Sequence, residues 1–209
     1  MSQTSPAALP DPLWIFASRQ LYLTKHNLTI TRQLTSASVA QFPRSGETEL
    51  DPDPDWLPLI DNPHKANAAI SPFTMSLLGR YWNEMNGESV RRQFYRHAPS
   101  RVASLFAFGD QATCQLVAQR YHWDLSEVCQ FRPVAIRNWG RFNMSIISIM
   151  NETARRQNSP VGQELWHAYW ASTPATYEIP AGTLNNDRIT LTSEPAIYEY
   201  LIDGVIELV

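Results

Sequence analysis

The chain has 209 residues, of which 44% are hydrophobic and 18% are charged, and its formal net charge at pH 7 is −3. This composition is sufficient for a sizeable hydrophobic core and excludes a globally disordered protein. The N-terminal residues lack the basic and apolar segments of a signal peptide, and no stretch approaches the roughly 20 apolar residues of a transmembrane helix. We therefore expect a soluble cytoplasmic protein with no membrane partner.

The N-terminal third predicts a flexible lead, two strands and a long loop. Residues 1–12 form the lead, and residues 13–209 are predicted to form a single α+β domain. "LWIFAS" at 13–18 is typical of a buried strand, and the β-branched and aromatic residues at 21–34 favour strand as well. The frequent prolines between about 41 and 72 predict a long irregular loop.

The middle of the chain predicts a helix followed by a strand. Apolar residues recur at helical spacing from 72 to 98, and Asn86-Gly87 is expected to break the helix. "RVASLFAF" at 101–108 is typical of a strand.

The following segments mix strand and helix signals. Asp110 is a suitable N-cap for a helix over 110–123, and "SEVCQFRPVAI" at 126–136 indicates a strand in which Pro133 marks an edge or a bulge. Two further helices are predicted, at residues 143–157 and 162–172. Because strands and helices follow one another without a regular βαβ alternation, we expect an α+β fold.

The last segment, "EPAIYEYLIDGVIELV" at 194–209, predicts a β-hairpin. Asp203-Gly204 is a favoured two-residue turn, since a type I′ turn needs positive φ at both positions. The register that this turn sets would place Glu199 as the single polar residue on an apolar face, which it would share with Ile197, Leu201, Ile206 and Leu208. A carboxylate at such a position needs an arginine partner, a raised pKa or a ligand, or else lies at an end of the sheet open to water.

Positive charge is concentrated in the middle of the chain. Between Arg80 and Arg156 there are eleven arginines and six acids, an excess of five positive charges in an otherwise acidic protein. Arginine pairs bidentately with phosphates and stacks on flat rings, so this pattern indicates a local anionic ligand or a nucleic-acid-binding module. Solvated helix faces are the alternative explanation.

Common catalytic and metal-binding motifs do not occur in the sequence. It contains no glycine-rich phosphate loop, no GxSxG and no HExxH. Cys114 and Cys129 form neither a metal-ligand nor a disulfide pattern, and the five histidines lack ligand spacing.

Four pieces of sequence, in order and spacing, resemble a family of uncharacterised bacterial proteins. They are "APSRVASLFAF", the helix "DQATCQLVAQRY", "HAYWAS" and "YEYLIDG", and together they lie within residues 71–209. That family is similar to a divergent branch of the ADP-ribosyltransferase fold. The resemblance implies split mixed or antiparallel sheets with flanking helices, and NAD⁺ as a substrate in a cleft between the sheets.

The resemblance also implies roles for particular residues. Glu199 falls at the catalytic glutamate, and Ser100 near the serine that begins the second core strand. Ser18, Arg19, Arg101 and Tyr169 are the other candidates for NAD⁺ contacts. Arg101 or Arg19 would hold the pyrophosphate, and Tyr169, Tyr198 or Tyr200 would stack on nicotinamide. Two positions depart from the family pattern: Phe16 stands where a histidine is expected, and Ile197 stands where arginine-modifying members carry an acid or amide.

The sequence therefore predicts an NAD⁺-dependent ADP-ribosyltransferase, with a toxin or defence role and an unknown protein or nucleic-acid acceptor. Glu199 would offset the positive charge that develops on the ribose as the bond to nicotinamide breaks. Two alternatives stay open: a catalytically inactive member of the same fold that acts as a binding module, and a nucleic-acid-binding module that uses the arginine-rich middle.

Overall fold

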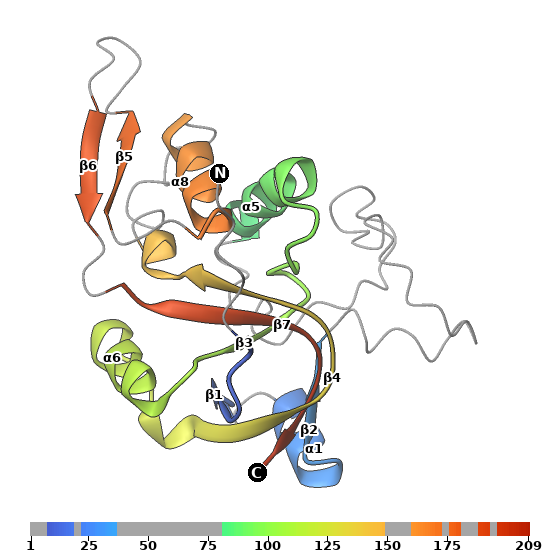
Figure 1. The fold of residues 1–209 in the computed structure, drawn as a ribbon. Helices are drawn as coiled ribbons and strands as arrows, with labels where there is room; N and C mark the ends of the chain where they lie inside the picture. The colour runs from blue at the N-terminus through green and yellow to red at the C-terminus, as the bar shows by residue number, and fades with distance from the viewer. Residues whose placement is uncertain are drawn as a thin grey trace.

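The computed structural model describes residues 8–18, 22–36, 81–148, 160–172, 176–180, 188–192 and 196–209. These residues form an α+β structure whose strand pairings are all antiparallel and whose helices flank the main sheet (Figure 1). The predicted loop at 41–72 and most of the predicted lead lie outside the described residues. None of the described helices is long and apolar enough to cross a membrane.

Two long strands, β4 (Val128–Asn143) and β7 (Tyr198–Leu208), form the centre of the sheet. The other edge of β7 pairs with β3 (Leu105–Ala107) near its start and with β2 (Gln33–Thr35) near its end. β1 (Leu13–Phe16) pairs with the start of β4.

A bridge between Trp14 and Phe108 connects β1 to the end of β3. The backbone amide of each residue donates to the carbonyl oxygen of the other, at 2.9 and 2.7 Å. Since β1 also pairs with β4, and β3 with β7, the four strands form a closed ring. Side chains of alternate residues fill one cluster within this sheet, including Leu13, Ile15, Leu105, Phe131, Tyr200, Ile202 and Ile206.

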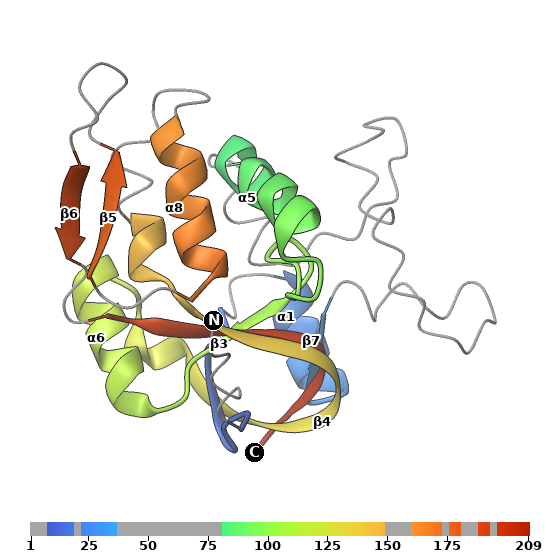
Figure 2. The same cartoon turned by 45° about the horizontal axis from the view of Figure 1, so that its top comes forward.

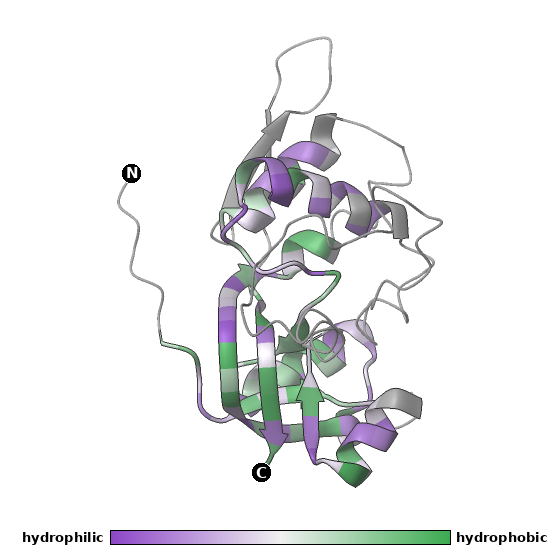
Figure 3. Ribbon diagram, turned by 90° about the vertical axis from the view of Figure 1, so that its right-hand side faces the viewer, coloured by the Kyte–Doolittle hydropathy of each residue, from purple (hydrophilic) through white to green (hydrophobic). Residues whose placement is uncertain are grey.

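Helices cover the outer sides of the ring. α5 (Tyr81–Phe94) and α8 (Pro160–Trp170) lie side by side over one side, and α6 (Gln111–Tyr121) lies apart from them (Figure 2). Two short helices precede strands of the main sheet: α1 (Tyr22–Ile30) comes before β2, and η4 (Leu125–Glu127) comes before β4. Outside this sheet, β5 (Thr176–Pro180) pairs with β6 (Arg188–Thr192) as a separate two-stranded sheet. Hydrophilic and hydrophobic residues are interspersed along both the strands and the helices, as expected for elements with one buried face (Figure 3).

Several sequence predictions are confirmed. β1 forms within the predicted strand, and Asp110 caps α6 by accepting a hydrogen bond from the Thr113 amide at 2.6 Å. The β4–β7 register shifts between Pro133 and Ala135, which is the bulge expected at Pro133. The predicted helix at 162–172 corresponds to α8. Of the predicted helix at 143–157, residues 145–148 are helical, and residues 149–157 lie outside the described part of the chain.

The strand predicted over residues 21–34 is wrong for its first part, which is the helix α1. The hydroxyls of Thr29 and Thr31 donate to the carbonyls of Lys25 and Asn27, four residues earlier, so β-branched residues are accommodated in helical backbone. Arg32, at a φ of 58°, ends this segment, and only β2 after it is a strand.

The helix break predicted at Asn86-Gly87 is also wrong, because α5 continues through both residues. A Cβ added to Gly87 would lie 2.6 Å from ring carbons of Trp166 on α8. Gly87 is therefore explained by the close approach of the Trp166 ring, which offsets the low helix propensity of glycine.

The strand predicted from residue 101 begins only at Leu105. Residues 101–104 form a turn, in which the amides of Ala103 and Ser104 donate to the carbonyl of Ser100 at 3.2 and 2.9 Å. Arg101 therefore projects from a turn and not from a strand.

The predicted C-terminal hairpin does not form, since β7 runs without interruption through Asp203 and Gly204. The backbone of β4 lies so close that a Cβ on Gly204 would be 2.3 Å from the carbonyl oxygen of Ala135. The predicted face is also wrong, because in an unbroken strand Glu199 shares its face with Leu201, Asp203 and Glu207, while Ile206 packs in the cluster on the other face. Glu199 is buried, and it pairs with Phe142 instead of Leu208.

Candidate functional site

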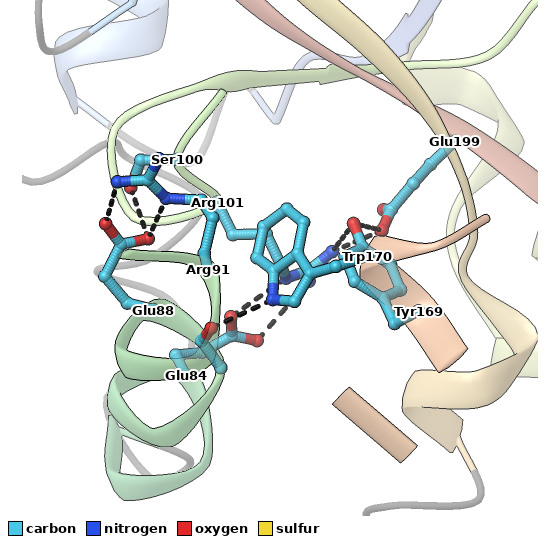
Figure 4. A network of polar contacts seen from close by, with 9 residues as sticks. Glu84, Glu88, Arg91, Ser100, Arg101, Tyr169, Trp170 and Glu199 are labelled. Carbon is cyan, nitrogen blue, oxygen red and sulfur yellow. Dashed lines mark hydrogen bonds and ion pairs between the residues drawn. The ribbon is translucent and has the colours of Figure 1, made fainter. Parts of the chain in front are cut away.

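The guanidinium of Arg101 lies at the centre of a buried polar cluster beneath α5 and α8 (Figure 4). Its Nε donates to Glu84 Oε2 at 2.9 Å and its Nη2 to Glu84 Oε1 at 3.3 Å. Its Nη1 donates to the Tyr169 hydroxyl at 2.8 Å and to Oε1 of Glu199. The charges are almost fully removed from water: Glu84 is 5% exposed, Arg101 3%, Tyr169 0% and Glu199 2%.

Four separate segments supply these groups. Glu84 lies in the first turn of α5, Arg101 in the turn before β3, Tyr169 near the end of α8, and Glu199 is the second residue of β7. The packing of α5 and α8 on the sheet therefore determines where Glu84 and Tyr169 meet Arg101 and Glu199.

Aromatic rings support the polar groups of the cluster. The Arg101 guanidinium carbon lies 4.9 Å from the centre of the Phe106 ring and 5.0 Å from that of Tyr169. The Tyr169 ring in turn stacks on Phe142, with centroids 5.1 Å apart. These contacts fix the guanidinium and the phenol relative to the sheet.

Burial and neighbouring charges have opposite effects on the pKa values of Glu199 and Arg101. Burial raises the pKa of Glu199 above its ordinary value of 4.5, and Glu84 adds to this, while Arg101 and the Tyr169 hydroxyl oppose it. Burial also raises the pKa of Tyr169 well above 10, so Tyr169 is a neutral hydrogen-bond donor at pH 7. For Arg101, the two carboxylates outweigh the effect of burial and raise the pKa, so the guanidinium stays charged.

The two oxygens of Glu199 have different surroundings. Both hydrogen bonds that described residues donate to Glu199, from Arg101 Nη1 and from the Tyr169 hydroxyl at 2.7 Å, reach Oε1. Within the described part of the chain, Oε2 receives no donor. A carboxylate held through one oxygen has the other available to accept a hydrogen bond from a ligand.

A second network lies one turn further along α5. Glu88 is 1% exposed and accepts from Arg91 Nε and from the Ser100 hydroxyl, each at 2.9 Å. Arg91 Nη1 also donates to the Ala98 carbonyl at 2.9 Å. The two consecutive residues Ser100 and Arg101 thus bind two acids of α5, Glu88 and Glu84, that are one helical turn apart.

The structure brings together three of the six predicted site residues: Glu199, Arg101 and Tyr169. Ser100 adjoins them but binds Glu88. Arg19 lies outside the described residues.

The first-strand candidates do not join the cluster in the described structure. The Ser18 hydroxyl donates to Glu127 at 2.9 Å. Phe16, at the position expected for a histidine, packs edge-on against Phe108 and Trp123. Among the residues described, neither Ser18 nor Phe16 makes a polar contact with Glu199 or Arg101.

Sequence reasoning missed Glu84. The available signal was Arg101 itself, since an arginine in an apolar segment requires an acidic partner. Because the sequence predicted a helix break at Asn86-Gly87, it did not place Glu84 and Glu88 on one helix face, and nothing in it showed that this segment meets residue 101.

Much of the arginine-rich middle is neutralised within the protein. Five of its arginines form ion pairs with acids: Arg91 and Arg92 with Glu88, Arg101 with Glu84 and Glu199, Arg132 with Glu207, and Arg137 with Asp203. Among the described residues, these pairs reduce the positive charge that the sequence concentrates in this part of the chain.

Comparison with known proteins does not assign the chain to a group. No protein-family model matches the sequence, and no curated protein matches it significantly. The described residues contain no group of three or more His, Cys, Asp or Glu side chains arranged to hold a metal ion.

Proposed function

We propose that the protein is an ADP-ribosyltransferase-like enzyme that uses NAD⁺ as its substrate and Glu199 as its catalytic carboxylate. The observation that carries this proposal is the convergence of Glu199, Arg101 and Tyr169 within hydrogen-bond distance. These residues come from distant parts of the sequence, and the resemblance to the ADP-ribosyltransferase fold implies a role for each of them in one site.

The chemistry requires a carboxylate beside the ribose. As the bond between nicotinamide and the anomeric carbon breaks, its electron pair leaves with nicotinamide and positive charge develops on the ribose. A carboxylate stabilises that charge, binds a ribose hydroxyl, and accepts the proton of the acceptor group that attacks the anomeric carbon. In this proposal, Oε2 of Glu199 contacts the ribose, while Arg101 and Tyr169 hold Oε1 and are positioning residues.

This arrangement changes the role proposed for Arg101. Arg101 is 3% exposed, and four of its five N–H donors already bind Glu84, Tyr169 and Glu199, so it cannot offer a bidentate edge to a pyrophosphate. Arg101 and Tyr169 therefore act on Glu199 in this proposal and do not contact NAD⁺ directly.

The burial of Glu199 favours a second candidate, a non-catalytic protein of similar fold that acts as a binding module. Glu199 is 2% exposed, so a ribose could reach Oε2 only if the residues that cover it moved. If they do not move, Glu199 cannot contact NAD⁺ and the cluster has a structural role.

Calorimetry with NAD⁺ and an assay of nicotinamide release distinguish the candidates. We expect the wild type to bind NAD⁺ and release nicotinamide, and Glu199→Gln to bind NAD⁺ with release lowered by about 100-fold or more. Glu207→Gln, on the same strand in a surface ion pair, is the matched control and should keep wild-type turnover. Absence of binding at millimolar NAD⁺ would reject the enzyme, binding without release would support the binding module, and undiminished release by Glu199→Gln would reject the role of Glu199.

A further inference from the structure

Glu84 determines how the Arg101 guanidinium faces Glu199. Its two carboxylate oxygens accept from Nε and Nη2 of Arg101, which form one edge of the planar guanidinium. Because the guanidinium is rigid, this contact fixes the direction of Nη1, the atom that donates to Tyr169 and Glu199.

Glu84 also sets the charge of the cluster. Arg101 carries one positive charge, which would neutralise Glu199 if the two residues formed an isolated pair. With Glu84 as a second acid on the same guanidinium, the three side chains carry a net charge of −1 when both carboxyls are ionised. A negative cluster attracts a developing positive charge, whereas a neutral pair does so much less.

We infer that Glu84 is a positioning residue of the Glu199 site, which orients Arg101 and compensates its charge so that Glu199 can act on a cationic transition state. This inference rests on the proposed function, but its effect on Glu199 is measurable without any substrate. It assigns to α5 a part in the site that sequence and resemblance did not indicate.

The groups around Glu199 make the effect of Glu84 separable. Among the described residues, the charged and titratable groups that act on Glu199 are Arg101 from the turn before β3, Tyr169 from α8 and Glu84 from α5. The directly opposite residue on β4 is the apolar Phe142. Removing the Glu84 charge leaves Arg101 with Glu199 as its only acidic partner in the cluster, which favours the ionised form of Glu199.

The first test is a carbon-13 NMR titration of the Glu199 carboxyl in protein labelled at glutamate, with the signal assigned by its loss in Glu199→Gln. We expect the pKa of Glu199 to be lower in Glu84→Gln than in the wild type. Glu88→Gln is the matched control, because it removes a buried acid from the same helix that binds Arg91 instead of Arg101. An unchanged pKa in Glu84→Gln, or an equal decrease in Glu88→Gln, would overturn the inference.

The second test separates charge from orientation. Glu84→Asp keeps the negative charge but shortens the side chain, so the pKa of Glu199 should stay closer to the wild-type value than in Glu84→Gln. In the nicotinamide-release assay, both variants should lower kcat by on the order of 100-fold, because Arg101 and Glu199 are no longer correctly oriented. Both should leave KM nearly unchanged. A raised KM with wild-type kcat would overturn the positioning role. Absence of turnover in the wild type would reject the proposed function and would leave the titration result to decide the link between Glu84 and Glu199.

Discussion

Arg101 forms an ion pair with Glu199 across 98 positions of sequence, and both side chains are at most 4% exposed. The pair joins the turn before β3 to the start of the central strand β7. Because Arg101 also binds Glu84, it connects α5 to the sheet through charge. The same contacts therefore hold the candidate site together and fix one layer of the fold on the other.

Replacement of Arg101 by methionine should strongly destabilise the protein. The variant keeps an unbranched apolar stem but leaves Glu84 and Glu199 buried without a cation, which typically costs about 3–5 kcal/mol. Arg132→Met is the matched control, because the Arg132 side chain is 62% exposed in its pair with Glu207, and such pairs contribute less than about 1 kcal/mol. Urea denaturation measures both free energies of unfolding, and equal losses in the two variants would contradict the central role of Arg101.

Removal of the Tyr169 hydroxyl should have a smaller effect. Tyr169→Phe keeps the ring stacked on Phe142 but removes one acceptor for Arg101 and one donor to Glu199. We expect a loss of about 1–3 kcal/mol in the free energy of unfolding, since both partners are buried charged groups. Tyr198→Phe is the control, because the described contact of Tyr198 is made by its ring, with Arg141; its stability should change by less than about 0.5 kcal/mol. A loss in Tyr198→Phe as large as that in Tyr169→Phe would show that the network is not the cause.

The sequence predicted those elements whose signals are local. Asp110 caps α6 by accepting a hydrogen bond from the amide of Thr113, three residues later. Pro133 disrupts the strand pairing because it lacks an amide hydrogen. Both effects could be anticipated from a few neighbouring residues. The hairpin predicted at Asp203-Gly204 was wrong because the same dipeptide suits both a tight turn and a close contact between two strands. Whether Gly204 faces solvent or the Ala135 carbonyl depends on β4, which lies more than 60 residues away in sequence.

The candidate site was predictable only in part for the same reason. That a buried Glu199 would need a partner such as arginine could be expected from the apolar residues near it in the sequence. Its contact with Arg101 through Oε1, and the contact of Arg101 with Glu84, depend on how α5 and α8 pack against the ring. No residue pattern within α5 distinguishes a buried acid from a solvated one, so Glu84 was not found.

Gly87 provides a test of helix packing that is independent of the charged cluster. Alanine would normally stabilise a helix by about 1 kcal/mol relative to glycine. At Gly87, however, the new Cβ would lie 2.6 Å from ring carbons of Trp166, whose side chain is 1% exposed and closely packed. We expect Gly87→Ala to destabilise the protein by about 1–3 kcal/mol. Asn86→Ala, at the exposed neighbouring position, should be neutral or slightly stabilising; if Gly87→Ala is also neutral, α5 and α8 are not packed as closely as described.

The raised pKa of Glu199 predicts how its contribution to stability depends on pH. Below the ordinary pKa of 4.5, the carboxyl is protonated in both the folded and the unfolded protein, and Glu199→Gln closely imitates that neutral form. As the pH rises above 4.5, the unfolded state ionises first, while burial keeps the folded carboxyl protonated until its raised pKa is reached. The folded state therefore binds more protons over this interval, and the stability that the wild type derives from Glu199 is lost as the pH rises through the folded pKa. Urea denaturation of both proteins from pH 4 to pH 8 should show the free energy of unfolding of the wild type decreasing relative to that of Glu199→Gln. A wild type that instead gains stability over the variant as the pH rises would mean that the attraction of Arg101 exceeds the effect of burial on Glu199.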